Sequence, residues 1–389
     1  MKKQLLFVIN HLTVGGIQKT LISALKVIDY DKCDVTVYLR KNRTDLLPFI
    51  DKRVNVIINN DANKYYRKPR AVWLQALIEI YKLMGKKQKA EEVKKDLSEL
   101  INQYCMKYEY NTFFADKKFD KAIAYANGYP AYFVADYIKA DEKIIFFHTS
   151  TNDLPDVHKK FISKFNKAVA VHDGLIPLIS EWHPCLEGKI SVIENYVDTD
   201  SLRMQASEKN IATPEEKTVL CSCGRFAPVK GFDLAVESAR ILKNNNVDFV
   251  WYFVGDGSEK DKLLNLTEKY KLSDNIIFTG MQKNPYPYMA ACNIYIQPSY
   301  EEAMPVTIIE AHRLGKPVIT TATVGGCKLV ENDVNGIVCG INSEAIAESI
   351  TNLINDKEKL IKISDNLKST DYSHEFEKYK EQWSALLEG

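Results

Sequence analysis

The 389-residue sequence has few of the features that mark a metal-binding, redox or membrane-spanning protein. Its eight cysteines form no CxxC pair, no histidines stand at zinc-finger spacing, and no apolar run approaches the ~18 residues of a membrane span. The cysteines therefore predict small buried side chains in a reducing compartment. Near the start, Leu5–Ile9 is too short for the core of a signal peptide and predicts a first β-strand. We expect a cytoplasmic protein, with peripheral attachment to the inner face of the cell membrane as an open alternative.

The sequence also has almost no net charge, +1, but its two halves differ. Residues 1–195 carry 31 Lys and Arg against 23 Asp and Glu, a net of +8, and residues 196–389 carry 21 against 28, a net of −7. Hydrophobic residues make up 46% of the chain and charged residues 26%, which excludes disorder and predicts a globular protein. The length fits two domains of about two hundred residues each.

Short apolar strands alternate with helical stretches along the chain. The strands expected before residue 196 are QLLFVI, DVTVYL, VNVII, KAIAY, KIIFFH, KAVAV and ISVIE. Those expected after it are TVLCSCG, FVWYFVG, NIIFTG, IYIQPS, PVITT and GIVCG. Most are continuous apolar runs, which is typical of parallel strands covered by helices on both faces. The pattern predicts an α/β protein of two doubly wound, Rossmann-like domains that divide near residue 195.

One segment, about 61–110, interrupts this alternation with helical periodicity and a strong positive charge. Between residues 64 and 89 it holds eight Lys or Arg and one acid, Glu79. It predicts either a membrane-surface element or a solvated helical hairpin that covers the sheet. In the first case Tyr65, Tyr66, Trp73 and Leu74 would lie at the interface, with the lysines on anionic headgroups. Nucleic-acid binding is disfavoured because no binding motif accompanies the charge.

Two loops have the composition of phosphate sites. In a doubly wound fold, ligands bind beyond the carboxyl ends of the strands, where loops lead into helices. The first loop contains Gly15 and Gly16, and paired glycines let backbone N–H groups approach a phosphate. It is not a GxGxxG fingerprint, so a dinucleotide cofactor is disfavoured. In the second half, Arg225 and Lys230 flank the loop after TVLCSCG and can converge on one diphosphate.

A third loop, after the strand IYIQPS, carries two carboxylates, Glu302 and Glu310, eight positions apart. A helix is expected to begin between them near Pro305, and its N-terminus offers free N–H groups to phosphate or sugar oxygens. Glu310 follows Ile308 and Ile309, so we expect it to be half-buried. A buried carboxylate needs a partner, and the two hydroxyls of a ribose are a natural one.

Taken together, these segments resemble glycosyltransferase family 4. The matching motifs are GRFAPVKGFD, VGDGSEKDKL, FTGMQKN, PSYEEAMPVTIIEA, GKPVITTATVGG and ENDVNGIVCG, with GGIQKTL near the start. The family consists of retaining enzymes of GT-B fold that use nucleotide-sugar donors. The resemblance implies an acceptor-binding domain over 1–195 with its insert at about 61–110, and a donor-binding domain over 196–372 that faces it across a cleft. It also implies a C-terminal helix, 373–389, that returns to the first domain.

The resemblance assigns roles by position. Arg225 and Lys230 resemble the cations that hold the donor diphosphate. Glu310 resembles the ribose-binding carboxylate, Glu302 the carboxylate near the donor sugar, and His148 the histidine beside the transferred sugar. The implied catalytic residues are Glu302, His148, Arg225 and Lys230. The implied donor contacts are Gly15, Gly16, Arg225, Lys230, Met281, Glu302, Met304, Pro305, Val306 and Glu310.

The implied reaction moves a hexosyl unit, with retention, from a nucleotide sugar to a lipid-linked or growing surface-polysaccharide acceptor. UDP is expected before GDP as the nucleotide, and no metal or other cofactor is expected, because Arg225, Lys230 and a helix N-terminus would stabilise the leaving diphosphate. Two alternatives stay open. One is a non-catalytic, sugar-nucleotide-binding subunit of a glycan-synthesis complex. The other is a metal-dependent glycosyltransferase that uses Asp198 and Asp200, although their place at the domain junction favours a helix cap.

Overall fold

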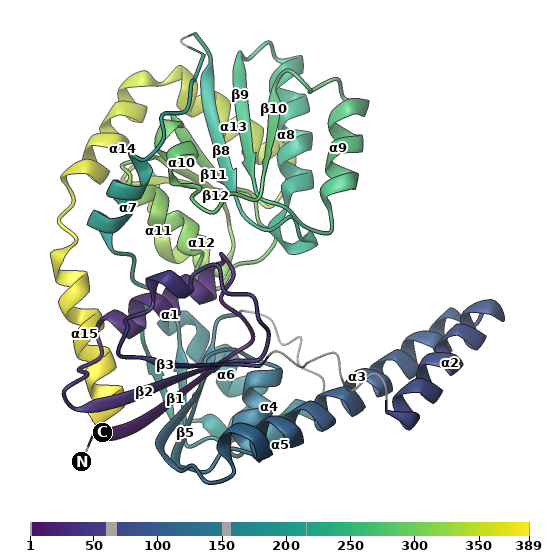
Figure 1. Cartoon of the computed structure of the whole chain (residues 1–389). Helices are drawn as coiled ribbons and strands as arrows, with labels where there is room; N and C mark the ends of the chain where they lie inside the picture. Colours follow the sequence, from purple (N-terminus) through teal and green to yellow (C-terminus); the bar gives the residue numbers. More distant parts are fainter. Residues whose placement is uncertain (1, 60–67, 150–156, 215, 389) are drawn as a thin grey trace.

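The computed structural model describes residues 2–59, 68–149, 157–214 and 216–388, which form two α/β domains (Figure 1). The first domain is built on a seven-stranded parallel sheet of order β3-β2-β1-β4-β5-β6-β7. Its strands are β1 (Lys3–Ile9), β2 (Cys33–Leu39), β3 (Asn55–Ile58), β4 (Phe119–Ala124), β5 (Ala140–Phe147), β6 (Lys167–Ala170) and β7 (Ile190–Val192).

The second domain repeats this plan with a six-stranded parallel sheet of order β10-β9-β8-β11-β12-β13. Its strands are β8 (Thr218–Cys223), β9 (Phe249–Val254), β10 (Ile276–Gly280), β11 (Ile294–Gln297), β12 (Val318–Thr321) and β13 (Gly336–Cys339). Each of the apolar runs predicted from the sequence forms a strand, and the predicted fold class is confirmed.

Helices cover both faces of each sheet. The helices before residue 196 are α1 (Gly16–Lys26), α2 (Pro69–Leu83), α3 (Lys87–Glu109), α4 (Tyr129–Asp136), α5 (Val157–Ile162) and α6 (Ile176–Trp182). Those after it are α7 (Thr199–Ala206), α8 (Phe232–Asn244), α9 (Lys260–Lys269), α10 (Tyr286–Ala291), α11 (Val306–Arg313), α12 (Val324–Leu329), α13 (Ser343–Asn355), α14 (Lys357–Ser369) and α15 (Ser373–Glu388).

The strand period explains why the runs are apolar throughout. Leu6 and Val8 of β1 lie in one core cluster, whereas the alternate residues Leu5, Phe7 and Ile9 lie in another on the opposite face of the sheet. Because successive side chains of a strand point to opposite faces, a strand that is buried on both sides needs an apolar residue at every position. The helices that cover both faces of each sheet therefore explain why the strands are continuous apolar runs.

The last helix, α15, leaves the second domain and packs against the first (Figure 1). Trp383 of α15 stacks on Phe146 of β5, with ring centroids 5.3 Å apart and an interplanar angle of 13°, and also lies beside Phe7 of β1. Lys121 of β4 donates to the backbone oxygen of Leu386. The core of the first domain thus contains residues from the end of the chain.

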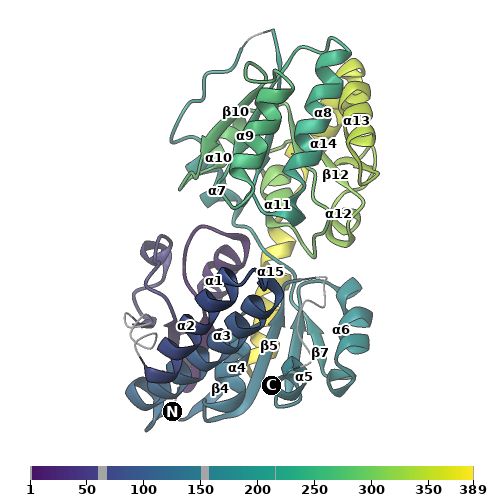
Figure 2. The ribbon, with the colours of Figure 1, turned by 90° about the vertical axis from the view of Figure 1, so that its right-hand side faces the viewer.

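The basic insert forms the helical hairpin α2–α3, which projects from the first domain in Figure 1 and toward the viewer in Figure 2. The second half of α3 enters the core of the domain through Leu100, Ile101 and Cys105. Leu74 is 7% exposed on the buried side of α2, so it is not the interfacial residue that the sequence suggested. Tyr65, Tyr66 and the cations at 64 and 67 lie outside the described residues.

Candidate active site

The order of the strands places one crevice in each domain. In the first sheet the order reverses between β1 and β4, and in the second between β8 and β11. Ligands of open α/β sheets bind at such switch points, beyond the carboxyl ends of the strands. The loop after β1 carries Gly15 and Gly16, the loop after β8 carries Arg225, and the loop after β11 carries Glu302. These four predicted residues therefore lie in loops that flank the switch points of the two sheets.

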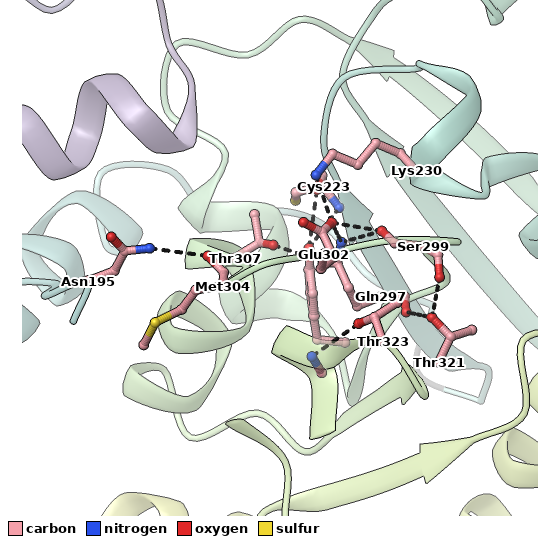
Figure 3. A network of polar contacts seen from close by, with 12 residues as sticks. Asn195, Cys223, Lys230, Gln297, Ser299, Glu302, Met304, Thr307, Thr321 and Thr323 are labelled. Atoms are coloured by element: carbon pink, nitrogen blue, oxygen red, sulfur yellow. Dashed lines mark hydrogen bonds and ion pairs between the residues drawn. The ribbon is translucent and has the colours of Figure 1, made fainter. Parts of the chain in front are cut away.

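Glu302 is the centre of a hydrogen-bond network at the second switch point (Figure 3). Its Oε1 atom accepts from Lys230 Nζ at 2.7 Å, Ser299 Oγ at 2.8 Å and Gln297 Nε2 at 2.9 Å. Gln297 is oriented in turn by Thr307 Oγ1, which donates to its amide oxygen at 2.9 Å. Glu302 is 8% exposed, so the ammonium of Lys230 supplies the positive charge that a buried carboxylate requires.

A close approach of the backbone brings Lys230 to Glu302. The next residue, Gly231, has a φ of +62°, and a Cβ there would lie 2.0 Å from the backbone oxygen of Pro298 at the end of β11. Only glycine fits both the left-handed conformation and this contact. Tyr300 N also donates to Val229 O at 2.9 Å, which joins the two loops. Arg225 and Lys230, which the sequence predicted to converge on one diphosphate, therefore have different surroundings. Lys230 forms an ion pair with Glu302, whereas Arg225 is exposed to solvent.

Glu310 lies one turn inside α11 and is 1% exposed. Its Oε1 atom accepts from Lys19 Nζ at 2.5 Å and from the hydroxyl of Tyr286 at 2.9 Å, while its Oε2 atom is buried with no hydrogen-bond partner in the described part of the chain. Burial opposes the charge of Lys19, but Glu310 and Tyr286 outweigh it and raise the pKa of Lys19. The sequence predicted that Glu310 would need a partner; the protein supplies Lys19 for one oxygen and leaves the other open.

Two helix N-termini meet where the two domains contact each other. A Cβ on Gly16, at the start of α1, would lie 3.7 Å from Cγ2 of Val306, at the start of α11. Since a helix N-terminus presents free N–H groups and a partial positive charge, the pair forms a setting for an anion held by both domains. Met304, beside this point, packs against core clusters of both domains, and its backbone oxygen accepts from Asn195 Nδ2 at 3.2 Å (Figure 3).

His148 follows β5 in the first domain, and burial lowers its pKa to about 4. The backbone of Tyr125 accepts a hydrogen bond from its ring, and Nε2 is buried with no partner among the described residues. The imidazole is therefore neutral at physiological pH, and Nε2 can accept a hydrogen bond from a ligand.

Three other strands of the first sheet are also followed by a residue with a buried polar atom that has no partner in the described part of the chain, as β5 is by His148. Buried polar atoms without a partner in the described ranges are Asn10 Oδ1 after β1, Arg40 Nε after β2 and Asn127 Oδ1 after β4. Buried polar groups are nearly always satisfied, so Asn10 Oδ1, Asn127 Oδ1 and His148 Nε2 can accept hydrogen bonds from ligand hydroxyls, and Arg40 Nε can donate to a ligand oxygen. Sequence reasoning singled out His148 alone and missed these residues, although each follows closely on an apolar strand.

The other predicted positions have different surroundings. Met281, after β10, is 58% exposed on the strand at the far edge of the second sheet. Asp198 caps α7 by accepting from Ser201 N at 3.1 Å and pairs with Lys26 at 3.0 Å, so it acts as the expected cap. Within the described ranges, no cluster of three His, Cys, Asp or Glu side chains could hold a metal. No described helix has both the length and the apolar character needed to cross a membrane.

The geometry defines a GT-B architecture: two Rossmann-like domains with ligand-binding loops at the switch points of both sheets. The family described as "Glycosyl transferases group 1" matches residues 204–370, the greater part of the second domain, and supports a glycosyltransferase.

Three known proteins illustrate the similarity. An uncharacterized glycosyltransferase of Haemophilus influenzae is 30% identical over 182 residues, 46% of this chain and 51% of that protein. The lipopolysaccharide core biosynthesis glycosyltransferase LpsE of Rhizobium meliloti is 28% identical over 169 residues, 43% and 48% of the two chains. The crystal structure of Anabaena Alr3699/HepE in complex with UDP-glucose superposes with a TM-score of 0.70 over 99% of both chains, at 18% identity. The matches to the two curated relatives span about half of their length, and the structural match shows the fold.

Proposed function

We propose that the chain is a retaining glycosyltransferase of family 4, which moves a hexosyl unit from a nucleotide sugar to a glycan acceptor. The observation that carries the proposal is the pair of buried carboxylates on either side of the α11 N-terminus. Glu302 is held by Lys230, and Glu310 keeps one buried oxygen, Oε2, open. A donor that presents a sugar, a diphosphate and a ribose diol would meet Glu302, the two helix N-termini and Glu310 in turn.

The proposed reaction needs positively charged groups beside the departing diphosphate. As the bond between the anomeric carbon and the diphosphate breaks, negative charge grows on the diphosphate. Arg225, Lys230 and the N–H groups at the start of α11 would stabilise this charge without reorganising. The acceptor oxygen attacks from the same face as the departing diphosphate and passes its proton to it, which retains the anomeric configuration. No metal or other cofactor enters the proposal.

The proposed donor is a UDP-sugar, ahead of a GDP-sugar, and the proposed acceptor is a lipid-linked or growing surface polysaccharide. The Anabaena structure holds UDP-glucose, and the Rhizobium relative is named for lipopolysaccharide core synthesis. The unpartnered polar atoms of Asn10, Asn127 and His148 would receive the acceptor on the side of the first domain. We further propose that the enzyme works in the cytoplasm at the inner face of the cell membrane.

The test combines binding and turnover. UDP or GDP at about 100 times its Kd should add about 2.7 kcal/mol of stability, seen as a rise in Tm. UDP-glucose and other UDP-sugars should then be hydrolysed slowly in the absence of acceptor, and Glu302→Ala should abolish hydrolysis while UDP still binds. Binding without hydrolysis of any sugar nucleotide would favour the non-catalytic subunit. If neither nucleotide shifts Tm, or if EDTA abolishes turnover, the proposal is wrong.

A further inference from the structure

The α2 helix carries apolar side chains on two opposite sides. On the side that packs on α3, Ala71, Leu74 and Ile78 are buried. On the other side, a set of large apolar residues is exposed to solvent. It consists of Val72 (50% exposed), Trp73 (61%), Ile80 (50%), Leu83 (89%) and Met84 (55%). Ile80 and Met84 stand seven and eleven positions after Trp73, so the three side chains lie on one stripe of the helix.

This exposed stripe is unusual within the molecule. Of the seventeen large hydrophobic residues exposed in the described part of the chain, five fall between residues 72 and 84. Single exposed apolar residues need no explanation, but a contiguous group marks a surface that something else covers. The hairpin projects from the body of the first domain in Figure 1 and lies in front of that domain in Figure 2, which leaves α2 open to a large partner.

Cations lie at the two ends of this stripe. Lys68 and Arg70 stand at the start of α2, and four lysines stand at its end, in the following turn and at the start of α3. These four are Lys82, Lys86, Lys87 and Lys89. The one acid between residues 68 and 89, Glu79, is neutralised by Lys82 at 2.7 Å. The lysines at 86, 87 and 89 are exposed and have no ion-pair partner among the described residues.

We propose that α2 lies in the surface of an anionic lipid bilayer, with Trp73, Ile80 and Leu83 in the acyl boundary and the cations on phosphate headgroups. A helix of 15 residues spans about 22 Å, and apolar residues between two cationic ends are the pattern of a helix that lies in the interface. Tryptophan prefers this depth because its ring is apolar with one polar edge.

The charge selects this partner over two others. A second copy of the chain would bring the same unpaired cations against each other, and like charges in contact are repelled. A nucleic acid would suit the lysines but would leave Leu83 and Met84 in water. Attachment here would place the first domain, the proposed acceptor side, beside the bilayer. The attachment does not depend on the donor chemistry, so it can fail or succeed without the proposed reaction.

The test measures binding of the full-length chain to vesicles, by co-sedimentation at low salt. We expect binding to vesicles of 70% phosphatidylcholine and 30% phosphatidylglycerol and little binding to pure phosphatidylcholine. Replacing three of these lysines, K86Q/K87Q/K89Q, should weaken binding on the order of 100-fold, since each cation near the surface contributes about fivefold. L83S/M84S should weaken it about tenfold through lost apolar contact. The controls, K357Q/K362Q/K380Q and I361S, remove three exposed lysines and one exposed apolar side chain elsewhere and should bind as the unchanged chain does.

A second readout locates the contact. Emission of the exposed Trp73 should shift to the blue on anionic vesicles, and the shift should vanish in Trp73→Phe. The inference is overturned if the unchanged chain binds neither kind of vesicle, if it binds both equally, or if the α2 variants bind like the controls. It is equally overturned if light scattering shows a dimer that L83S/M84S dissociates, because α2 would then be an interface between copies. Because each readout is binding rather than turnover, failure here leaves the proposed reaction untouched.

Discussion

Lys19 and Glu310 form an ion pair between the two domains, with Nζ and Oε1 2.5 Å apart although 291 positions separate them in sequence. Lys19 belongs to α1 of the first domain and Glu310 to α11 of the second, so the pair ties the domains at the proposed ribose site. Glu310 is 1% exposed and Lys19 21%. A second ion pair from the same helix, Lys26 with Asp198, has side chains 48% and 36% exposed. The two pairs give a natural comparison between a buried and an exposed contact.

Substitution of Lys19 by methionine should let the two domains separate. Without its ammonium, Glu310 is an uncompensated buried charge, and breaking such a pair costs about 3 kcal/mol. The carboxylate recovers hydration if the domains separate, so we expect a lower Tm, a larger radius of gyration in X-ray scattering and about tenfold weaker UDP binding. Lys26→Met should cost roughly 0.5 kcal/mol and leave the radius unchanged. Lys19→Arg keeps the charge and should restore UDP binding; equal effects of the two methionine variants would contradict the role of Lys19.

Lys230 and Glu302 should be energetically coupled. Lys230→Met leaves Glu302 buried without a cation and should lower the free energy of unfolding by about 3 kcal/mol. In the double variant with Glu302→Gln that loss should shrink, giving a coupling energy of about 1–3 kcal/mol in a double-mutant cycle from chemical denaturation. Activity should stay absent in the double variant, since both charges are gone. Strictly additive stabilities would show that the 2.7 Å contact is not maintained in solution.

Glycine-to-alanine substitutions should separate ligand contact from folding. At Gly16 the added methyl would lie 3.7 Å from Val306, an ordinary contact, so Tm should hardly change. The methyl would nevertheless lie where both helix N-termini meet, and UDP binding should weaken. At Gly231 the same change meets Pro298 O at 2.0 Å with a φ of +62°, so that variant should lose stability. A stable Gly16→Ala variant that binds UDP with unchanged affinity would remove Gly16 from the proposed donor site.

Stability should fall as the pH falls below about 6.5. Burial lowers the pKa of His148 to about 4, from 6.5 for a free side chain, and lowers the pKa of His312 to about 3, with Arg313 adding to the effect. The unfolded chain therefore binds these protons at a higher pH than the folded chain, and each histidine lowers the free energy of unfolding by about 1.4 kcal/mol per pH unit in its window. His148→Gln should flatten the pH dependence of Tm between pH 6.5 and 4.5. The control His374→Gln, at an exposed position, should leave it unchanged.

The strands could be predicted because burial on both faces leaves a local signal: β9, for example, is FVWYFV, apolar at every position. The carboxylates of the second domain could be singled out because they flank one helix start. The partner of Glu310 could not, since Lys19 reaches it only through the packing of two domains. Its motif, GGIQKTL, was visible, but nothing local distinguishes Lys19 from the other lysines of the first domain.

The basic insert shows a different limit. Its positive charge and helical period are local properties and predicted either a membrane-surface element or a helical hairpin, but α2 is apolar on two sides. Sequence alone cannot show which side packs on α3. It predicted that Leu74 would lie at the membrane surface, but Leu74 is buried, whereas Ile80 and Leu83 are exposed. Similarly, Asn10 and Asn127 are ordinary loop residues in sequence. Their polar atoms stand out only once the fold buries them without a partner.

The packing of α15 sets the order of events during synthesis. The ribosome completes all seven strands of the first sheet by Val192, but Trp383, which stacks on Phe146 and lies beside Phe7, is made almost two hundred residues later. Until then the aromatic surface of the first sheet is open to water, to chaperones or to another nascent chain. The second domain can therefore finish folding first, and the first domain closes its core only after α15 has been made.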